Sequence, residues 1–427
     1  MREALFLFIL FLANISSSSV YAQQACPAGE HWDSSMHMCM PNKCPAGEHW
    51  DSGMNMCMPN TSNNSLHIHT NAFLVGSSTS GPQGRNAIYS PNMGMIEYKL
   101  KLSEKSTFGA DAMLSTEKWT LPKTGSPQVL QTGEATQDGT LYNNAQHPHP
   151  AVMGVGVSYS RTVGMSDDNK ITLFFDPRGE ATAGPPAFMH RKSSESNPNV
   201  PLGHHVGQDV FHITSTVAGA KYEDQKTTVA ASVFSGKEPI PTSLAIDMHK
   251  PDSYGILVSR FITPEIQAGT SFANVLSAHQ DAIQIQEGAE KENAFSAWVS
   301  TKHQIKNGTL NTASIFGMVS NRTTHTNLKS FLEEFSYELE KNNFFGRIEV
   351  LQRTPEQLQI AVTDNLTGAR WVQALTVGYE RKIAQTNDTR IYAGGSYTKS
   401  IVPSEFKSTY GGNPDQVELH LRVNLMK

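Results

Sequence analysis

The stretch 416–426, QVELHLRVNLM, alternates strictly between apolar and polar side chains. One face of an extended chain would carry Val417, Leu419, Leu421, Val423 and Leu425, and the other Glu418, His420, Arg422 and Asn424. A period of two residues is typical of a β-strand whose two sides face different surroundings. The stretch therefore predicts a strand between an apolar and a polar environment.

The same alternation recurs from about His67 to the end of the chain. In residues 152–159, for example, Met153 and Val157 oppose Gly154 and Ser158. The stretch 330–341, SFLEEFSYELEK, could also form a helix, but its strand-like neighbours favour a strand. Sixteen strands are predicted, near 67–76, 94–103, 107–115, 151–163, 170–177, 209–220, 226–235, 252–262, 265–277, 292–302, 309–320, 328–340, 344–353, 369–382, 388–399 and 416–426.

Short turns and long polar loops connect these strands. Turn sequences occur at 104–106, 224–225, 307–308 and 385–388, whereas 178–208 and 278–291 are long and polar. Short turns at one end and long loops at the other are typical of bacterial outer-membrane barrels, whose outer face is apolar and whose lumen is polar. We therefore predict an all-β fold, an antiparallel transmembrane β-barrel of about 14–16 strands over residues 67–427, preceded by a short Cys/Met-rich segment.

The start of the chain predicts export. Arg2, the apolar run 4–13 and the sequence Val20-Tyr21-Ala22 are typical of a signal peptide that is removed after residue 22. The net charge of −5 gives no reason to expect a nucleic-acid partner. The expected location is the bacterial outer membrane, with the following segment in the periplasm. The expected partners are outer-membrane lipid and the machinery that assembles barrels, and the expected state is a monomer.

A tandem repeat occupies residues 23–61. CPAGEHWDSSMHMCMPNK (26–43) is followed by CPAGEHWDSGMNMCMPNT (44–61), with 15 of 18 positions identical, and a polar linker, 62–66, follows. All four cysteines lie here, and an even number in an exported chain permits disulfides. The simplest pairing is one bond per repeat, Cys26 with Cys39 and Cys44 with Cys57, but three connectivities are possible.

The repeats also hold potential metal ligands. Thioethers and imidazoles suit copper, and imidazoles also suit zinc. The alternative is that the methionines pack as apolar filler on the nearby tryptophans. The candidate ligands are Met36, His37, Met38, Met40, Met54, Met56 and Met58.

A second group of potential ligands lies in two loops that each precede a predicted strand. The first loop carries His147 and His149, and the second carries Met189, His190, His204, His205 and His212. His212 alternates with Phe211 and Ile213, so we expect it to face the lumen while they face lipid. If the loops fold inward, the histidines could converge on a copper or zinc ion. The alternative is a hydrogen-bond network that braces a loop.

These loops carry motifs that resemble a known family. QHPH (146–149), GPPAFMHR (184–191), NPNVPLGHH (197–205) and SGKEP (235–239) are similar to those of bacterial outer-membrane β-barrel proteins linked with copper and heavy-metal resistance loci. The similarity extends from about residue 67 onward. Pro150 stands where the family's pattern has an acidic residue, so no role of that residue carries over. The resemblance implies a barrel fold and a connection with metal.

Three functions are therefore compared. The first is an outer-membrane barrel that binds or passes a soft or borderline metal ion, copper before zinc, through the repeats and the His-rich loop. The second is a general porin-like or structural barrel without a metal role. The third is an envelope-lipid hydrolase, for which Ser158, Ser160 or Ser215 could act with a histidine, but no nucleophile motif marks any of them.

Overall fold

The computed structural model describes residues 30–33, 38–41, 48–51, 56–59 and 64–427, the last without 136–140, 165–167, 210, 242, 279–289 and 362–366. The chain divides into two units, Met1–Thr61 and Ser62–Lys427, each considered by itself. In the first unit, each repeat contains an antiparallel strand pair: β1 (Glu30–Asp33) with β2 (Met38–Pro41), and β3 (Glu48–Asp51) with β4 (Met56–Pro59).

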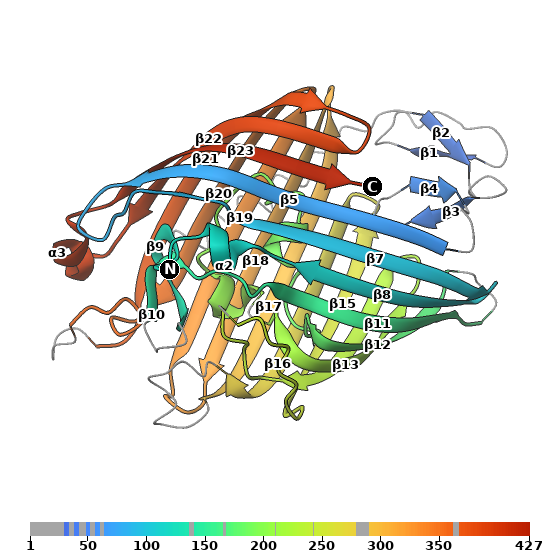
Figure 1. The fold of residues 1–427 in the computed structure, drawn as a ribbon, viewed down its shortest axis with the longest axis horizontal. Coiled ribbons are helices and arrows are strands. Elements are labelled where there is room, and N and C mark those ends of the chain that lie inside the picture. The colour runs from blue at the N-terminus through green and yellow to red at the C-terminus, as the bar shows by residue number, and fades with distance from the viewer. Residues whose placement is uncertain are drawn as a thin grey trace. The chain divides into compact units, whose positions relative to one another are not determined.

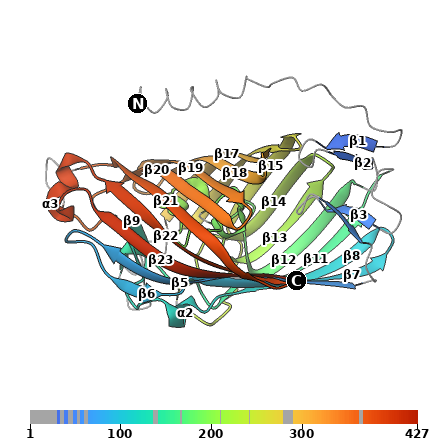
Figure 2. The ribbon, with the colours of Figure 1, turned by 90° about the horizontal axis from the view of Figure 1, so that it is seen from above.

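The second unit is a closed antiparallel β-barrel (Figure 1). Its wall has 16 strands when the short β6 and the following β7, which pair in succession with β5, are counted as one. Pairing of β23 with β5 closes the ring (Figure 2). The wall comprises β5 (Asn64–Thr79), β6 (Ala87–Tyr89), β7 (Asn92–Ser103), β8 (Ser106–Leu114), β11 (Val152–Thr162), β12 (Lys170–Gly179), β13 (Thr214–Glu223), β14 (Thr227–Ser235), β15 (Ser253–Thr263), β16 (Ile266–Ala278), β17 (Glu290–Ile305), β18 (Gly308–Asn321), β19 (Asn327–Leu339), β20 (Asn342–Arg353), β21 (Arg370–Gln385), β22 (Thr389–Ile401) and β23 (Asp415–Met426).

The fold class and the strand number confirm the sequence prediction. The stretch 330–341 lies mainly in the strand β19, not in a helix. The strand β5 begins at Asn64, within the stretch expected to be a linker. In β23, Leu419 and Leu421 are exposed on the outer face, whereas Glu418 and Arg422 are each only 1% exposed. Alternation therefore separates an apolar outer face from a polar interior, as a wall between lipid and a polar lumen requires.

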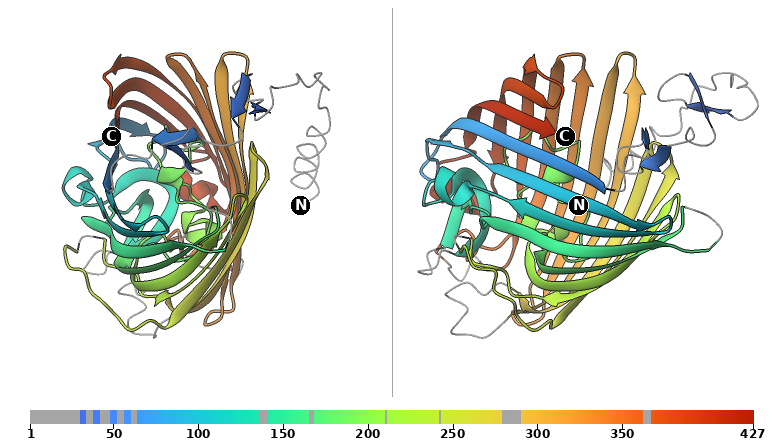
Figure 3. Two further views of the ribbon diagram at one scale, coloured as in Figure 1. Left: turned by 90° about the vertical axis from the view of Figure 1, so that its right-hand side faces the viewer. Right: turned by 45° about the vertical axis from the view of Figure 1, so that its right-hand side comes forward.

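The interior of the barrel is occupied. Residues 180–209 and 211–213, which we call the plug, leave β12, cross the lumen and return to β13 (Figure 3). Its wall partners come from strands around the ring, so the plug reaches across the lumen. Hydrogen bonds join it to Asn71 in β5, Ser232 in β14, Ser271 in β16, Ser296 in β17, Ser330 and Glu334 in β19, Asn343, Arg347 and Arg353 in β20, and Glu418 in β23.

A hairpin that the sequence did not predict covers one side of the plug. It consists of β9 (Ser126–Ala135) and β10 (Leu141–Gln146), and register shifts interrupt its pairing. Gln128 donates to the carbonyl of Val200 at 2.6 Å, and Arg353 donates to the carbonyl of Leu130 at 3.1 Å. In Figure 1 the hairpin lies at the same end of the barrel as the helix α3 (Lys407–Tyr410).

The other short helices are α2 (Glu117–Thr120), η2 (Phe188–His190), η3 (His204–Gln208) and η5 (Ser404–Phe406). None of the helices in the described residues has the length and apolar character needed to cross a membrane.

Two details of the predicted pattern were wrong. The predicted strand 209–220 begins only at Thr214, so His212 lies in the plug, and Phe211 and Ile213 are buried in the interior and do not face lipid. Their alternation reflects packing between the plug and the wall. Met153 does not face outward with Val157, because a β-bulge between Val152 and Gly154 turns it into the interior, where it is fully buried.

The apolar outer face gives the first prediction. Leu421 lies near the middle of β23 and is exposed on the outer face. An arginine on the lipid face of a barrel costs about 2–4 kcal/mol near the bilayer midplane. We expect Leu421→Arg to lower the unfolding free energy by about that amount, measured by urea unfolding in lipid vesicles. Leu421→Ala is the control without charge, and equal stability of the two variants would contradict a lipid-facing position.

Candidate metal site in the barrel plug

Five imidazoles from two separate segments meet inside the barrel. His147 and His149 follow β10, while His204, His205 and His212 belong to the plug. The ring centroid of His204 lies 4.4 Å from that of His205 and 4.5 Å from that of His212. The ring centroids of His147 and His205 are 5.6 Å apart, and those of His149 and His212 are 5.5 Å apart. We call these five residues the imidazole cluster. All five are buried.

The local backbone explains how adjacent residues reach the same cluster. The turn η3 is interrupted at Val206 and Gly207, where the backbone is not helical and φ of Gly207 is +73°. The carbonyl of Val206 accepts a hydrogen bond from Ser330 Oγ at 2.7 Å. A Cβ at Gly317 would lie 2.2 Å from this carbonyl oxygen, so only glycine lets the turn lie so close to β18. The wall therefore fixes the turn that carries His204 and His205.

Three of the imidazoles are oriented through Nδ1. His149 Nδ1 pairs with Glu117 Oε2 at 2.7 Å, and His212 Nδ1 lies 2.9 Å from the Asp209 carbonyl oxygen. His204 Nδ1 pairs with the Asp209 carboxylate. The Nε2 atoms of these three rings are buried and have no hydrogen-bond partner among the described residues. A metal-binding histidine typically donates its second N–H to a carboxylate or carbonyl in this way, which leaves the other nitrogen for the metal.

A ligand set is present within the cluster. His147, His204 and His205 each offer a ring nitrogen, and these three atoms all lie within 4.8 Å of one another. Three imidazoles with an open fourth position are a common set for zinc, and imidazoles also suit copper. The three residues therefore have the donor type and the proximity that one transition-metal ion requires after a small adjustment of the rings.

The surroundings keep two of the five imidazoles neutral. Burial, aided by His149 and His204, lowers the pKa of His147 to about 3. Burial also places the pKa of His212 well below its usual value. Burial lowers the pKa of His149 too, but the Glu117 carboxylate outweighs this effect, so the pKa of His149 is raised. His147 and His212 therefore keep a free nitrogen lone pair at neutral pH, as metal binding requires.

The carboxylate within the cluster is charged. Burial raises the pKa of Asp209, but His204, His212 and Arg191 outweigh burial, so the net pKa lies below its usual value. Asp209 contacts two of the imidazoles, because its carboxylate pairs with His204 and its backbone carbonyl lies beside Nδ1 of His212. The sequence did not mark Glu117 at all, because it lies in the short helix α2, far from any histidine motif.

Two predicted ligands do not join the imidazole cluster. Met189 is buried in a separate apolar cluster with Met93, Met153, Ala187 and Ile213. His190 is exposed, and no ring contact links it to the five imidazoles. The short helix η2 explains the positions of both side chains, because successive residues of a helix point in different directions.

The candidate ligands of the repeats lie where the structure gives no side-chain description. Met38, Met40, Met56 and Met58 belong to β2 and β4, and Met36, His37 and Met54 lie outside the described residues. Cys39 and Cys57 occupy the same two strands, whereas Cys26 and Cys44 lie outside the described residues. The metal role of the repeats and the disulfide pairing stay predictions.

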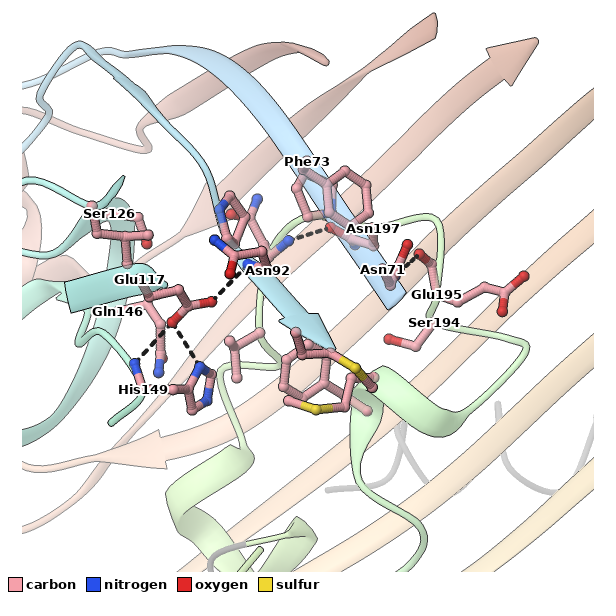
Figure 4. Close-up of a pocket in the computed structure, with 18 residues that line it drawn as sticks. Asn71, Phe73, Asn92, Glu117, Ser126, Gln146, His149, Ser194, Glu195 and Asn197 are labelled. Carbon is pink, nitrogen blue, oxygen red and sulfur yellow. Dashed lines mark hydrogen bonds and ion pairs between the residues drawn. The ribbon is translucent and has the colours of Figure 1, made fainter. Parts of the chain in front are cut away.

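A small pocket adjoins the imidazole cluster (Figure 4). Its cavity volume is about 40 Å³, and its wall includes His149 and Glu117 together with Met93 and Met189. Gln146 also lines the pocket, and neither atom of its buried amide has a hydrogen-bond partner among the described residues. A cavity of this size has room for a few water molecules or an ion, and the amide of Gln146 offers polar atoms beside it.

Gly133 gives a prediction on the geometry of the cluster. Its φ is +135°, and a Cβ built on it would lie 2.6 Å from Cδ2 of the His205 ring. We expect Gly133→Ala to displace this ring and to lower the thermal unfolding midpoint of the barrel. The matched control is Gly368→Ala, which also has positive φ but has no atom within 4 Å of the added Cβ. Equal midpoints for the two variants would mean that His205 has room to move.

The lowered pKa of His147 gives a prediction on pH. The pKa is about 3 in the folded chain and 6.5 for an ordinary histidine, so between these values the unfolded chain binds a proton that the folded chain does not. Stability should therefore fall as pH drops below 6.5, by at most about 1.4 kcal/mol per pH unit for one group. We expect His147→Gln to reduce the slope of unfolding free energy against pH between 6.5 and 4.5. An unchanged slope would show that His147 does not titrate in this way.

Comparisons with known proteins bear on the fold. No protein-family model matches the chain, and no curated protein sequence matches it. Solved structures do match: the anion-selective porin of Comamonas acidovorans is 9% identical, covers 85% of this chain and 100% of its own, and has a TM-score of 0.51. OmpF of Salmonella typhi in complex with daunomycin is 9% identical over 85% and 98% of the two chains, with a TM-score of 0.52. OprB of Pseudomonas putida is 11% identical over 86% and 94%, also with a TM-score of 0.52. The chain therefore has a porin-like barrel fold, and the apolar outer face and these likenesses support an outer-membrane location.

Proposed function

We propose that this chain is an outer-membrane barrel whose plug binds a borderline transition-metal ion at the imidazole cluster. The observation that carries the proposal is the ligand group of His147, His204 and His205, whose nitrogens lie within 4.8 Å of one another in a buried site. The carboxylate that orients His204 supports the same role, because oriented imidazoles hold a metal more tightly than mobile ones.

The charge of the cluster supports a cation as the occupant. Burial keeps His147 neutral, so its ring offers a nitrogen lone pair, and the Asp209 carboxylate partly offsets the ion's charge within the buried site. Both zinc and copper accept imidazole ligands. The resemblance of the loop motifs to barrels linked with copper-resistance loci supports copper as the physiological ion, either bound within the barrel or passed through it.

A porin-like or structural barrel is the second candidate function. The likeness of the fold to three porins favours it. In this case the imidazoles would brace the plug through Glu117 and Asp209, without a metal. The plug contacts strands all round the ring, so a general pore would need the plug to move or to leave a narrow path. A lipid hydrolase has less support, because Ser160, one candidate nucleophile, pairs with Thr172 at 2.9 Å and not with an imidazole.

Metal titration separates the first two functions. We expect the refolded chain to bind Cu(II) and Zn(II) stoichiometrically, and the double variant His204→Ala/His205→Ala to bind at least about 100-fold more weakly. Asp209→Asn should weaken binding about 10- to 100-fold, because it removes the charge that orients His204 but keeps the side-chain shape. The matched control is His303→Ala, a histidine of β17 outside the cluster.

The same titration of a chain without residues 23–61 assigns each binding event to the repeats or to the barrel. Binding that is lost only on deletion would place the metal in the repeats. Affinities in the cluster variants equal to those of the unchanged chain would contradict the proposed barrel site and leave the imidazoles with the bracing role.

A further inference from the structure

A second group of soft donors lies beside the imidazole cluster and takes no part in it. Outside Met1 and the repeats the chain has nine methionines: Met93, Met95, Met113, Met153, Met165, Met189, Met248, Met318 and Met426. Three of them, Met93, Met153 and Met189, are buried together, and Met113 packs against them. Met95 is the cross-strand partner of Met113. More than half of these methionines therefore share one part of the interior, which we call the thioether cluster.

Four different elements contribute to the thioether cluster. Met93 and Met95 point inward from β7, because they alternate with outward-facing Ile96 and Tyr98. Met113 comes from β8, and Met189 comes from the plug. Met153 reaches the cluster only because of the β-bulge in β11, which reverses the side to which it points. Bulges that redirect a side chain in this way are common next to functional sites.

The cluster borders a small cavity. Met93, Met153 and Met189 are buried, whereas Met95 and Met113 are only partly buried. The pocket of about 40 Å³ in Figure 4 is lined by Met93 and Met189 and also by His149, whose Nε2 has no hydrogen-bond partner among the described residues. Two methionines and one histidine therefore line the same cavity, which is large enough for an ion.

The composition of the wall indicates that apolar packing alone does not explain the methionines of the thioether cluster. Further along the inner faces of the same two strands lie Glu97, Lys99 and Asp111, so charged side chains are accepted there. The methionines next to these charged residues are partly exposed, so they are not needed to fill a closed apolar core. They do place thioether sulfurs in the lumen. Thioethers are uncharged soft donors that select Cu(I) and similar ions over harder divalent cations.

We propose that the thioether cluster is a second metal site, specific for a soft monovalent cation of the Cu(I) or Ag(I) class. Thioethers do not need to lose a proton before they bind, unlike protonated imidazoles. Binding at this site is therefore independent of pH between 5 and 7, apart from any share of His149. The proposal stands on the methionines and does not depend on the imidazole site being occupied.

The test uses Ag(I), which is stable in air, as the probe for the full chain. Equilibrium dialysis followed by metal analysis gives the number of bound Ag(I) ions for the unchanged chain and for the triple variant Met93→Leu/Met113→Leu/Met189→Leu. Leucine conserves the volume, so folding should persist, and heat-dependent gel mobility checks it. The matched control is Met248→Leu/Met318→Leu/Met426→Leu, because these methionines lie outside the cluster. The repeats are unchanged in all three proteins, so their Ag(I) binding cancels.

We expect the triple variant to lose one Ag(I) equivalent, or to bind it more than 10-fold more weakly, while the control equals the unchanged chain. Zn(II) binding by the triple variant should be unaffected, which separates this result from failure of the imidazole site. An Ag(I) isotherm identical to that of the unchanged chain would overturn the proposal and leave the methionines as packing. If the triple variant does not fold, the partly exposed Met95→Leu/Met113→Leu pair is the second variant, and the same two outcomes apply.

Discussion

The plug depends on one buried carboxylate. Glu334 on β19 pairs with Arg191 of the plug at 2.7 Å and with Arg347 of β20 at 3.3 Å, and all three side chains are almost fully buried. Removal of one partner from a buried ionic group leaves an uncompensated charge and costs about 3–5 kcal/mol. The plug therefore cannot move away from this position without a large cost, and the neighbouring hydrogen bonds from Arg347 and Arg353 to plug carbonyls limit it further.

A fixed plug changes what the barrel can do. The structures that this fold resembles include porins, but here the segment in the lumen contacts strands on all sides. The same contacts hold His204 and His205 against the loop that carries His147 and His149. Because the wall orders the imidazoles before any ligand arrives, a metal ion would find its donors largely in position, and little conformational entropy would be lost on binding.

The sequence predicted the wall better than the interior. Alternation in β23 and β19 depends on the local contrast between lipid and a polar lumen, so it can be recognised from a few residues. Phe211 and Ile213 alternate as well, but they pack between the plug and the wall, and the sequence does not distinguish this from lipid contact. The convergence of His147 with His204 and the bulge at Met153 depend on contacts between distant segments, for which one sequence contains no local pattern.

The closure of the ring between β5 and β23 also has a consequence for assembly. Residues of the first and the last wall strands pair directly, as Ala72 does with Val423, so the ring is complete only after every other strand is in place. The plug precedes most of the wall in the chain and hydrogen-bonds to strands that are made later, such as β19 and β20. The contacts of the plug with β19 and β20 therefore form only when those strands take their places in the wall, so the seated plug and the finished sheet depend on each other.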